Sequence, residues 1–556
     1  MRTRAVEELK KSQLVLNEWV YELPEPFESE LIRIKYGKLS KPKALKFAFS
    51  IEGLENINKP NRNLKAPNYS PITKTENDFY KRYLTNENSK SLGVVVTDVD
   101  RVKSMIHKNG EPILWQMGPL RRSLALAQRA GFFLRVTDKK VLKTIVDIDS
   151  GKTPIPPRNN RRHSAVEKIL GMTKRGDVTE ARGLKELGYK KISAEKYVSR
   201  SDSARYGLFN RVGKYTRSYL GVGSLPACSG WRDVIVMSAL ANMPIFIARN
   251  NIFAENIDLQ IQLVKSAQKT IKSLGLSRKN TDIALRNIGV AIGSNPEIEL
   301  EKVQRLYKVA GVKLFRIYTI NADPRVLETA VKIRNEMGKK IELFVGQISD
   351  TKQAKQLVDW AKVDGLIFGH GGGRQCTSAI NGMAISAVED LYDIVTNPHF
   401  NDTTILQEGG VGTNVGPLLV LGVDGILYNQ QMTRGTIETG GVFLQDRFGN
   451  YGQPYHGSAS APTMIIESAN PAIKNRINPS GRTRVPEGKP GFTKFTYKTN
   501  SMSFWIDEFR HHLARTLADL GVSSIAELRE MLSRDKREFL RVVSQEASSV
   551  AKAYKS

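Results

Sequence analysis

One stretch of the sequence brings together a thiol, two hydroxyls and a run of glycines, which is a set of groups that a nucleophilic site can use. Residues 365–378 read Gly-Leu-Ile-Phe-Gly-His-Gly-Gly-Gly-Arg-Gln-Cys-Thr-Ser. Glycines let the backbone turn with positive φ and approach a ligand closely. Cys376, followed by Thr377 and Ser378, could attack a small molecule held there. For a cysteine taken alone, the alternative is a buried structural thiol beside a Gly-rich turn.

The segments around this loop alternate between apolar strands and amphipathic helices from about Tyr219 onward, as in a protein with a parallel sheet. The expected strands cover Pro244–Ala248, Ile288–Ile292, Leu314–Tyr318, Ile341–Val345, Gly365–Phe368, Thr404–Gln407 and Gly425–Tyr428. The expected helices cover Asp258–Leu274, Pro296–Ala310, Pro324–Met337, Asp350–Ala361, Gly382–Val395 and Asn414–Leu421. This pattern predicts an α/β fold of the (β/α)8 TIM-barrel class. Its active site would lie at the C-terminal ends of the strands, where the Cys376 loop begins.

Positive charge is concentrated in the first part of the chain. Residues 1–220 contain 44 Lys and Arg against 24 Asp and Glu, and so carry +20 of the total net charge of +28. Nucleic acid is the leading candidate for a partner of such a region, and a solvated basic surface is the alternative. We therefore expect three parts. They are a basic N-terminal α+β region for nucleic-acid binding or assembly at 1–210, the barrel at 211–535, and a basic C-terminal helix at 536–556.

Two segments of the N-terminal region carry weaker signals. Thr153–Arg162 is rich in Pro and Arg, which is typical of a linker or an exposed loop. Thr179–Leu187, Gly188 and Ser193–Ser199 together predict a helix–turn–helix-like pair. Such a pair could read DNA, or it could simply be two helices that pack on the rest of the fold.

The composition, with 40% hydrophobic and 25% charged residues, is that of an ordinary globular protein. Two cysteines, Cys228 and Cys376, exclude a disulfide scaffold and suit a reducing compartment. The N-terminus lacks the apolar segment of a secretory signal, and the longest apolar stretch, Val234–Ala248, is too short to span a bilayer. The histidines lack metal-ligand spacing. We expect a cytoplasmic protein with no membrane partner and no metal site.

The Cys376 loop and several later segments resemble one known family. Gly371–Ser378 is similar to the Gly-x-Gly-Ser-x-Cys-Thr-Thr loop of the IMP dehydrogenase and GMP reductase family, and Gln407–Val411 is similar to its Asp-Gly-Gly-Ile strand end. Tyr455–Ser460 resembles its Tyr-Arg-Gly-Met-Gly-Ser segment. Further similarity lies in Gly223–Asn250, Leu421–Ile426, Arg484–Pro486 and Leu520–Leu528. The resemblance covers about residues 220–535, and the layout, without a regulatory insertion in the early barrel, is nearer to GMP reductase.

The resemblance implies a chemistry. In this family a Cys thiolate attacks C2 of the purine of a nucleoside monophosphate, and NAD or NADP takes or gives hydride at that carbon. Cys376, with Thr377 and Ser378, would be catalytic, and Glu408 would accept hydrogen bonds from the ribose hydroxyls. The alternative for Glu408 is a salt bridge within the loop. The other implied substrate contacts are Gly371, Gly372, Gly373, Arg374, Gly409, Gly410, Tyr455, Gly457 and Ser458. A monovalent cation at the loop carbonyls and a homo-tetramer follow by analogy alone.

Several positions depart from the family pattern. Arg374 replaces a phosphate-binding Ser, Glu408 is one methylene longer than the usual Asp, and Tyr428-Asn429-Gln430 stands in place of Met-Gly-Ser. Tyr318-Thr319 lacks the Asp that dehydrogenases carry near the nicotinamide. The flap has no Arg-Tyr pair for hydrolysis, and its candidate residues are Ser480, Arg482, Arg484 and Glu487.

Two functions are compatible with the sequence. The first is a purine-nucleotide oxidoreductase, with a lean toward the reducing, GMP-reductase-like direction because the hydrolytic pair is missing. The second is a nucleic-acid-associated protein that keeps the barrel as a binding or assembly module. The basic N-terminal region and the altered phosphate contacts favour this second hypothesis. An enzyme that modifies a purine within a polynucleotide, or an unusual nucleotide, would join both.

Overall fold

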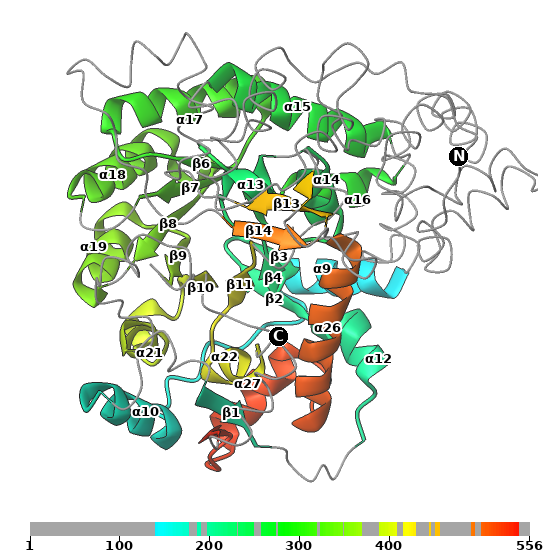
Figure 1. Ribbon diagram of the computed structural model, residues 1–556, viewed down its shortest axis with the longest axis vertical. Coiled ribbons are helices and arrows are strands. Elements are labelled where there is room, and N and C mark those ends of the chain that lie inside the picture. Colours follow the sequence, from blue (N-terminus) through cyan, green and yellow to red (C-terminus); the bar gives the residue numbers. More distant parts are fainter. Residues whose placement is uncertain are drawn as a thin grey trace, which may run out of the picture.

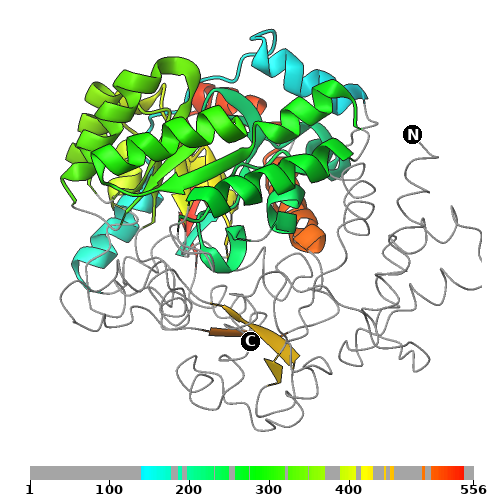
Figure 2. The same cartoon turned by 90° about the horizontal axis from the view of Figure 1, so that it is seen from above.

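A parallel sheet forms the centre of the molecule (Figures 1 and 2). The computed structural model describes residues 139–176, 186–190, 197–230, 232–249, 257–273, 276–319, 323–348, 350–369, 389–408, 415–429, 444–445, 451–455, 491–494 and 502–543. The strands of the central sheet are β4 Leu220–Gly221, β5 Ile245–Ile247, β6 Ile288–Ile292, β7 Leu314–Tyr318, β8 Glu342–Ile348, β9 Gly365–Phe368, β10 Thr404–Glu408 and β11 Gly425–Leu427. Their order is β4-β11-β10-β9-β8-β7-β6-β5. A parallel bridge between Val222 and Ile245 joins the two outer strands and closes the sheet into a barrel.

Helices alternate with the barrel strands and cover its outer surface (Figure 2). They are α14 Arg232–Leu240, α15 Ile257–Ser273, α16 Arg278–Leu285, α17 Pro296–Ala310, α18 Arg325–Met337, α19 Thr351–Ala361, α21 Glu389–Val395 and α22 Gly416–Leu421. Local sequence fixes their starts. The Asn295 side chain accepts a hydrogen bond from the Ile298 amide at the start of α17, where Pro296 is the first helical residue. Asp350 caps α19 in the same manner.

The predicted (β/α)8 TIM-barrel fold is confirmed, and so are all seven predicted strands. The predicted helices are confirmed too over their described residues, and the parts that lie outside these are 274, 382–388 and 414. The sequence analysis missed β4 and α16. With only two residues, β4 is too short for its apolar pattern to stand out. Most of α16 is polar, so its sequence shows little helical periodicity.

The barrel interior has an apolar middle with a polar layer at each end. Side chains from alternate strand positions, together with one from the hairpin below, form the middle: Val212, Phe246, Leu314, Phe344, Ile367, Leu406 and Leu427. Their strand neighbours, such as Phe315 and Leu343, belong to the larger core beneath the helices. This alternation follows from the period of two along a strand. Because both faces of each strand are buried, the strands have nearly continuous apolar sequences.

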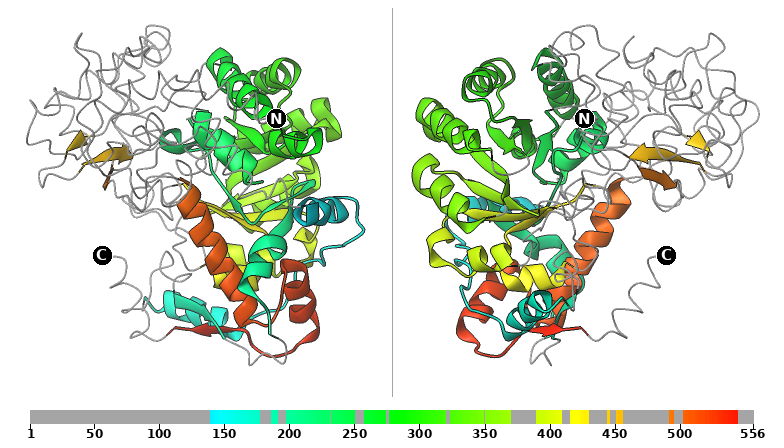
Figure 3. Two further views of the ribbon diagram at one scale, coloured as in Figure 1. Left: turned by 90° about the vertical axis from the view of Figure 1, so that its right-hand side faces the viewer. Right: turned by 60° about the vertical axis from the view of Figure 1, so that its left-hand side comes forward.

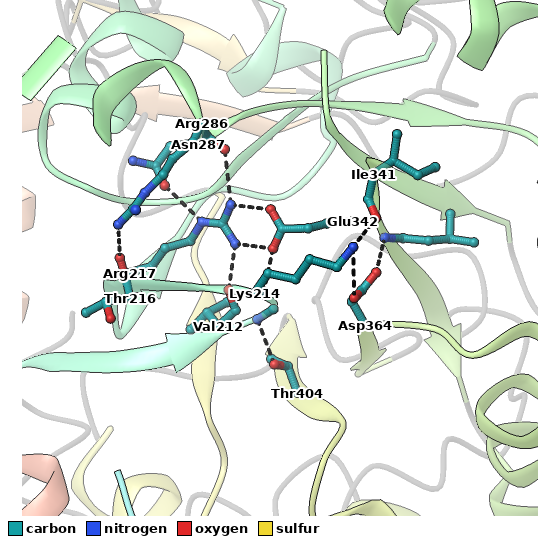
Figure 4. A network of polar contacts seen from close by, with 12 residues as sticks. Val212, Lys214, Thr216, Arg217, Arg286, Asn287, Ile341, Glu342, Asp364 and Thr404 are labelled. Carbon is teal, nitrogen blue, oxygen red and sulfur yellow. Dashed lines mark hydrogen bonds and ion pairs between the residues drawn. The ribbon is translucent and has the colours of Figure 1, made fainter. Parts of the chain in front are cut away.

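A hairpin closes the N-terminal end of the barrel (Figure 4). Its strands are β2 Phe209–Val212 and β3 Tyr215–Ser218. The Arg217 guanidinium lies against Glu342, the first residue of β8, and donates to its two carboxylate oxygens at 2.8 and 2.7 Å. It also donates to Asn287 Oδ1 and to the carbonyls of Val212 and Arg286. The barrel is therefore sealed at this end by a buried ion pair rather than by hydrocarbon.

Segments from the predicted N-terminal region pack on the barrel or on the helix Met502–Asp519. They include α9 Lys139–Asp149, α10 Ser164–Lys174, α12 Arg200–Asp202 and the π-helical η3 Ser203–Gly207. Val166 and Ile169 of α10 belong to the same hydrophobic core as the barrel helices. The predicted exposed loop Thr153–Arg162 is wrong at its centre, because Arg158 is 5% exposed and ion-paired with Asp424, which also binds Arg529. The predicted boundary at residue 210 therefore does not separate two cores.

The C-terminal part of the chain returns to this region. Helices α26 Met502–Asp519 and α27 Ile525–Arg534 lead to strand β15 Leu540–Val542, which pairs antiparallel with β1 Leu187–Tyr189 (Figure 3). A helical turn at Gly188 and a C-terminal helix over 540–542 are thus wrong predictions, because both stretches are strands. Residues 197–199, 536–539 and 543 of those two predictions are not helical either. Residues 179–185, 193–196 and 544–556 lie outside the described residues, as do residues 1–138.

A separate small antiparallel sheet contains β12 Leu444–Gln445, β13 Tyr451–Tyr455 and β14 Gly491–Lys494. The short elements α13 Pro226–Ser229, η4 Gly338–Lys340 and η5 Pro398–Phe400 complete the described structure. Within the described part of the chain, no helix combines the length and the apolar character needed to cross a lipid bilayer.

Candidate functional site

A cluster of polar groups lies at the C-terminal ends of the barrel strands. Arg316 on β7 donates to Glu408, the last residue of β10, from Nη1 to Oε1 at 3.0 Å and from Nη2 to Oε2 at 2.5 Å. Gln347 on β8 donates to Oε2, and Asn429, just after β11, donates to Oε1, each at 3.1 Å. The Gly223 amide, after β4, donates to Asn429 Oδ1 at 2.8 Å. We call these five residues the mouth cluster.

The ion pair at the centre of the mouth cluster is buried. The Arg316 side chain is 0% exposed and that of Glu408 is 5% exposed. Burial by itself raises the pKa of Glu408, but the charge of Arg316 and the hydrogen bonds from Arg316, Asn429 and Gln347 outweigh it and hold the pKa below its ordinary value. The guanidinium also lies 4.6 Å from the ring centroid of Tyr318. The carboxylate is thus ionised and held in one place.

Two glycines leave room for the Glu408 side chain and backbone. A Cβ on Gly223 would lie 1.8 Å from Glu408 Oε1, and a Cβ on Gly369 would lie 1.7 Å from the Glu408 carbonyl oxygen. Gly369 also has φ +117°, a conformation that side chains disfavour. Gly369 follows β9, so the segment that carries Cys376 begins directly against the backbone of β10.

The structure describes two of the predicted site residues. Glu408 ends β10, as predicted, and its carboxylate is occupied by Arg316. Tyr455 ends β13 and pairs with Gly491 of β14. The other predicted catalytic, substrate-binding and flap residues lie outside the described residues: Cys376, Thr377, Ser378, Gly371, Gly372, Gly373, Arg374, Gly409, Gly410, Gly457, Ser458, Ser480, Arg482, Arg484 and Glu487.

Sequence reasoning missed most of the mouth cluster. Asn429 was noted as a departure from the family pattern, and Gly223 only as part of a resembling segment, but neither Arg316 nor Gln347 was singled out. A signal for Arg316 does exist, since it is the one charged residue in the strand Leu-Phe-Arg-Ile-Tyr. A charge inside a buried strand needs a partner of opposite sign. The sequence does not say which carboxylate that partner is.

The mouth also holds buried polar atoms that have no hydrogen-bond partner among the described residues. They include Ser224 Oγ, just after β4, and Arg249 Nε, just after β5. Such atoms in native proteins are usually paired with protein, water or a ligand. Both groups can donate, so each can bind an acceptor that the described residues do not supply.

Comparison with known proteins agrees with the barrel. The family described as "IMP dehydrogenase / GMP reductase domain" matches residues 239–550. Over 215 residues the chain is 24% identical to inosine-5'-monophosphate dehydrogenase of Bacillus subtilis (strain 168). The aligned part is 37% of this chain and 41% of that enzyme, so the chain spans less than half the length of the curated relative.

Proposed function

The chain belongs to the IMP dehydrogenase / GMP reductase family, and from this premise we propose that it is an oxidoreductase acting at C2 of a purine nucleotide. The observation that carries the proposal is the path of the chain at the barrel mouth. The Gly365–Phe368 strand ends at the C-terminal face and continues through Gly369, which lies against the end of β10, toward Cys376. Barrel enzymes place their reacting groups at this face.

In the proposed reaction the Cys376 thiolate adds to C2 of the purine, so its pKa must be low enough for the thiolate to form. Gly371, Gly372 and Gly373 let the loop backbone approach the nucleotide, and Thr377 and Ser378 supply hydroxyls beside the sulfur. Arg374 adds positive charge near the nucleotide phosphate. In the reducing direction, which we favour, the 2-amino group takes up a proton and leaves C2 as ammonia, hydride then adds to C2, and the C–S bond breaks to return the Cys376 thiolate.

A nicotinamide cofactor, NAD or NADP, supplies or accepts the hydride when it is bound. Ser224 and Arg249 are the described residues that would hold it, because each has a buried donor atom with no described partner. We extend the proposal to Gly409, Gly410, Tyr455, Gly457 and Ser458 as further nucleotide contacts, and to Ser480, Arg482, Arg484 and Glu487 as flap residues. A tetramer is proposed by analogy with the family and is tested by light scattering.

The test incubates the protein with purine monophosphates and each nicotinamide cofactor. Turnover is monitored by nicotinamide absorbance, and adduct formation by the intact mass of the protein. The wild-type protein should show a change in absorbance, or a mass increase located at Cys376. Cys376→Ser should lose both, whereas Cys228→Ser is a matched control, since Cys228 is buried in the hydrophobic core. Activity that survives Cys376→Ser would contradict the proposed nucleophile.

A second candidate function is nucleic-acid association through residues 1–210, for which the observation is the +20 charge of residues 1–220. Gel shifts with DNA and RNA over a range of salt concentrations test it, comparing the full chain with a variant that lacks residues 1–138. Removal of this segment deletes no described helix or strand. Affinity should fall steeply with salt in the full chain. A salt slope that truncation leaves unchanged would exclude residues 1–138 from the phosphate contacts, and the absence of a shift with both DNA and RNA would contradict this function.

A further inference from the structure

The carboxylate of Glu408 has no capacity left for a ligand. A carboxylate has about four lone-pair positions, and Glu408 accepts four hydrogen bonds, two from Arg316 and one each from Gln347 and Asn429. The charge of Arg316 also neutralises it at close range. The resemblance assigns this position the task of accepting hydrogen bonds from both ribose hydroxyls. In this chain the corresponding lone pairs are used within the protein.

The partners of Glu408 supply no second carboxylate: the side-chain acceptors among these described residues are the amide oxygens of Gln347 and Asn429. Arg316 has donors and no acceptor, and the side-chain oxygen of Asn429 already accepts from the Gly223 amide. A sugar hydroxyl at the mouth cluster could accept a hydrogen bond, but among the residues that the structure describes there it would find no free carboxylate for its own proton. A hydroxyl desolvated without an acceptor is destabilising.

We propose that this site does not select for the sugar hydroxyls, and that it binds 2′-deoxyribonucleotides of purines at least as well as the ribonucleotides. The inference rests on the proposed function, because it concerns the sugar of the same nucleotide. It differs from what the family resemblance implies for Glu408. Arg316 acts here as a positioning residue that determines specificity through Glu408.

The direct test uses the wild-type full-length protein and calorimetric binding of IMP, GMP and their 2′-deoxy and 2′,3′-dideoxy forms. Dissociation constants of each ribo and deoxy pair should agree within about threefold, or favour the deoxy form. A site that uses a polar group to bind a substrate hydroxyl usually discriminates against an analogue that lacks this hydroxyl by a much larger factor than threefold. A preference for the ribo form greater than about threefold therefore overturns the inference.

Two variants separate the effect of Arg316 from a general loss of stability. Arg316→Gln removes one of the two charges and at least one of the donors that occupy Glu408, so the ribo form should gain about tenfold over the deoxy form, as expected for hydrogen bonds to a charged group. Arg217→Gln is the matched control. It breaks an equally buried arginine–glutamate pair, with side chains 0% and 2% exposed, at the opposite end of the barrel. This control should leave the ratio of the two affinities unchanged.

The outcomes distinguish this inference from the proposed function. Binding of both sugar forms without redox turnover supports the inference and counts against the oxidoreductase. Turnover confined to ribonucleotides supports the oxidoreductase and overturns the inference. If no purine monophosphate binds at all, the proposed function fails and the inference fails with it. A ratio that shifts equally in Arg316→Gln and Arg217→Gln contradicts the role given to Arg316, and the wild-type ratio decides the sugar question even where a variant does not fold.

Discussion

Replacement of Arg217 by Met tests how the N-terminal end of the barrel is held together (Figure 4). All five N–H donors of this guanidinium are used. Nε donates to Asn287, Nη1 to Val212 and Glu342, and Nη2 to Arg286 and Glu342. Methionine fills much of the same volume but supplies neither the charge nor a donor. The substitution therefore leaves the buried Glu342 carboxylate without the guanidinium that pairs with it.

The expected loss in the free energy of unfolding is about 3–5 kcal/mol, the usual cost of removing one member of a buried ion pair. Glu342 keeps one donor, the Lys214 amide at 2.8 Å, which offsets only a fraction of this. Removing both charges, in Arg217→Met/Glu342→Leu, eliminates the unpaired carboxylate. We therefore expect the double variant to be more stable than Arg217→Met by about 2 kcal/mol or more.

The measurement is urea-induced unfolding followed by far-ultraviolet circular dichroism, comparing midpoints among variants whose denaturant slope is the same. Arg278→Met is the control, because Arg278 is exposed at the start of α16 and its loss should change stability by less than about 0.5 kcal/mol. If the double variant were no more stable than the single one, an unpaired carboxylate would not be the cause of the loss. The account of the hairpin as an electrostatic seal would then be wrong.

Three other perturbations follow from the same structure. Because the pKa of Glu408 is lowered below its ordinary value of 4.5, its contribution to stability is full above that pH and is lost as the pH falls through the folded-state pKa. The urea midpoint of unfolding should therefore fall as the pH is lowered through the acidic range, and Glu408→Gln should reduce this pH dependence. Asp424→Asn removes the charge that two buried arginines share, and should lower the free energy of unfolding by about 3–5 kcal/mol in urea titrations. Gly369→Ala should lower the melting temperature more than Gly151→Ala, because both have positive φ but a Cβ meets another atom within 4 Å only at Gly369.

The sequence was most informative about the barrel strands. Strands β6, β7 and β9 were predicted residue for residue, because each is a short apolar run bounded by polar or glycine residues and buried on both faces. The same reasoning failed for Leu187–Tyr189. This strand pairs with Leu540–Val542, and its structure depends on a partner distant in the sequence rather than on its own pattern.

The net charge was less informative than its size suggested. The excess of Lys and Arg in residues 1–220 favours a polyanion partner, yet Arg158 and Arg217 from this segment are buried in ion pairs within the protein. Composition records how many arginines a segment contains, whereas a binding surface depends on which of them are exposed. The charges in residues 139–220 that face inward cannot contribute to binding a polyanion. Even so, residues 139–220 contain 20 Lys and Arg against 8 Asp and Glu, so the hypothesis of nucleic-acid association still includes this segment as well as residues 1–138.

The candidate site also depends on contacts between residues that are distant in the sequence, and the sequence alone does not reveal these contacts. The sequence located Glu408 at the end of β10 and recorded its extra methylene as an isolated departure. In the sheet, β10 and β7 are separated by β8 and β9, so Glu408 and Arg316 can meet only across the barrel interior. A buried arginine there requires a carboxylate within reach, and a longer side chain extends further from β10 toward β7. The glutamate and the arginine are thus best understood as one feature, in which a carboxylate that could have bound a sugar instead neutralises a cation.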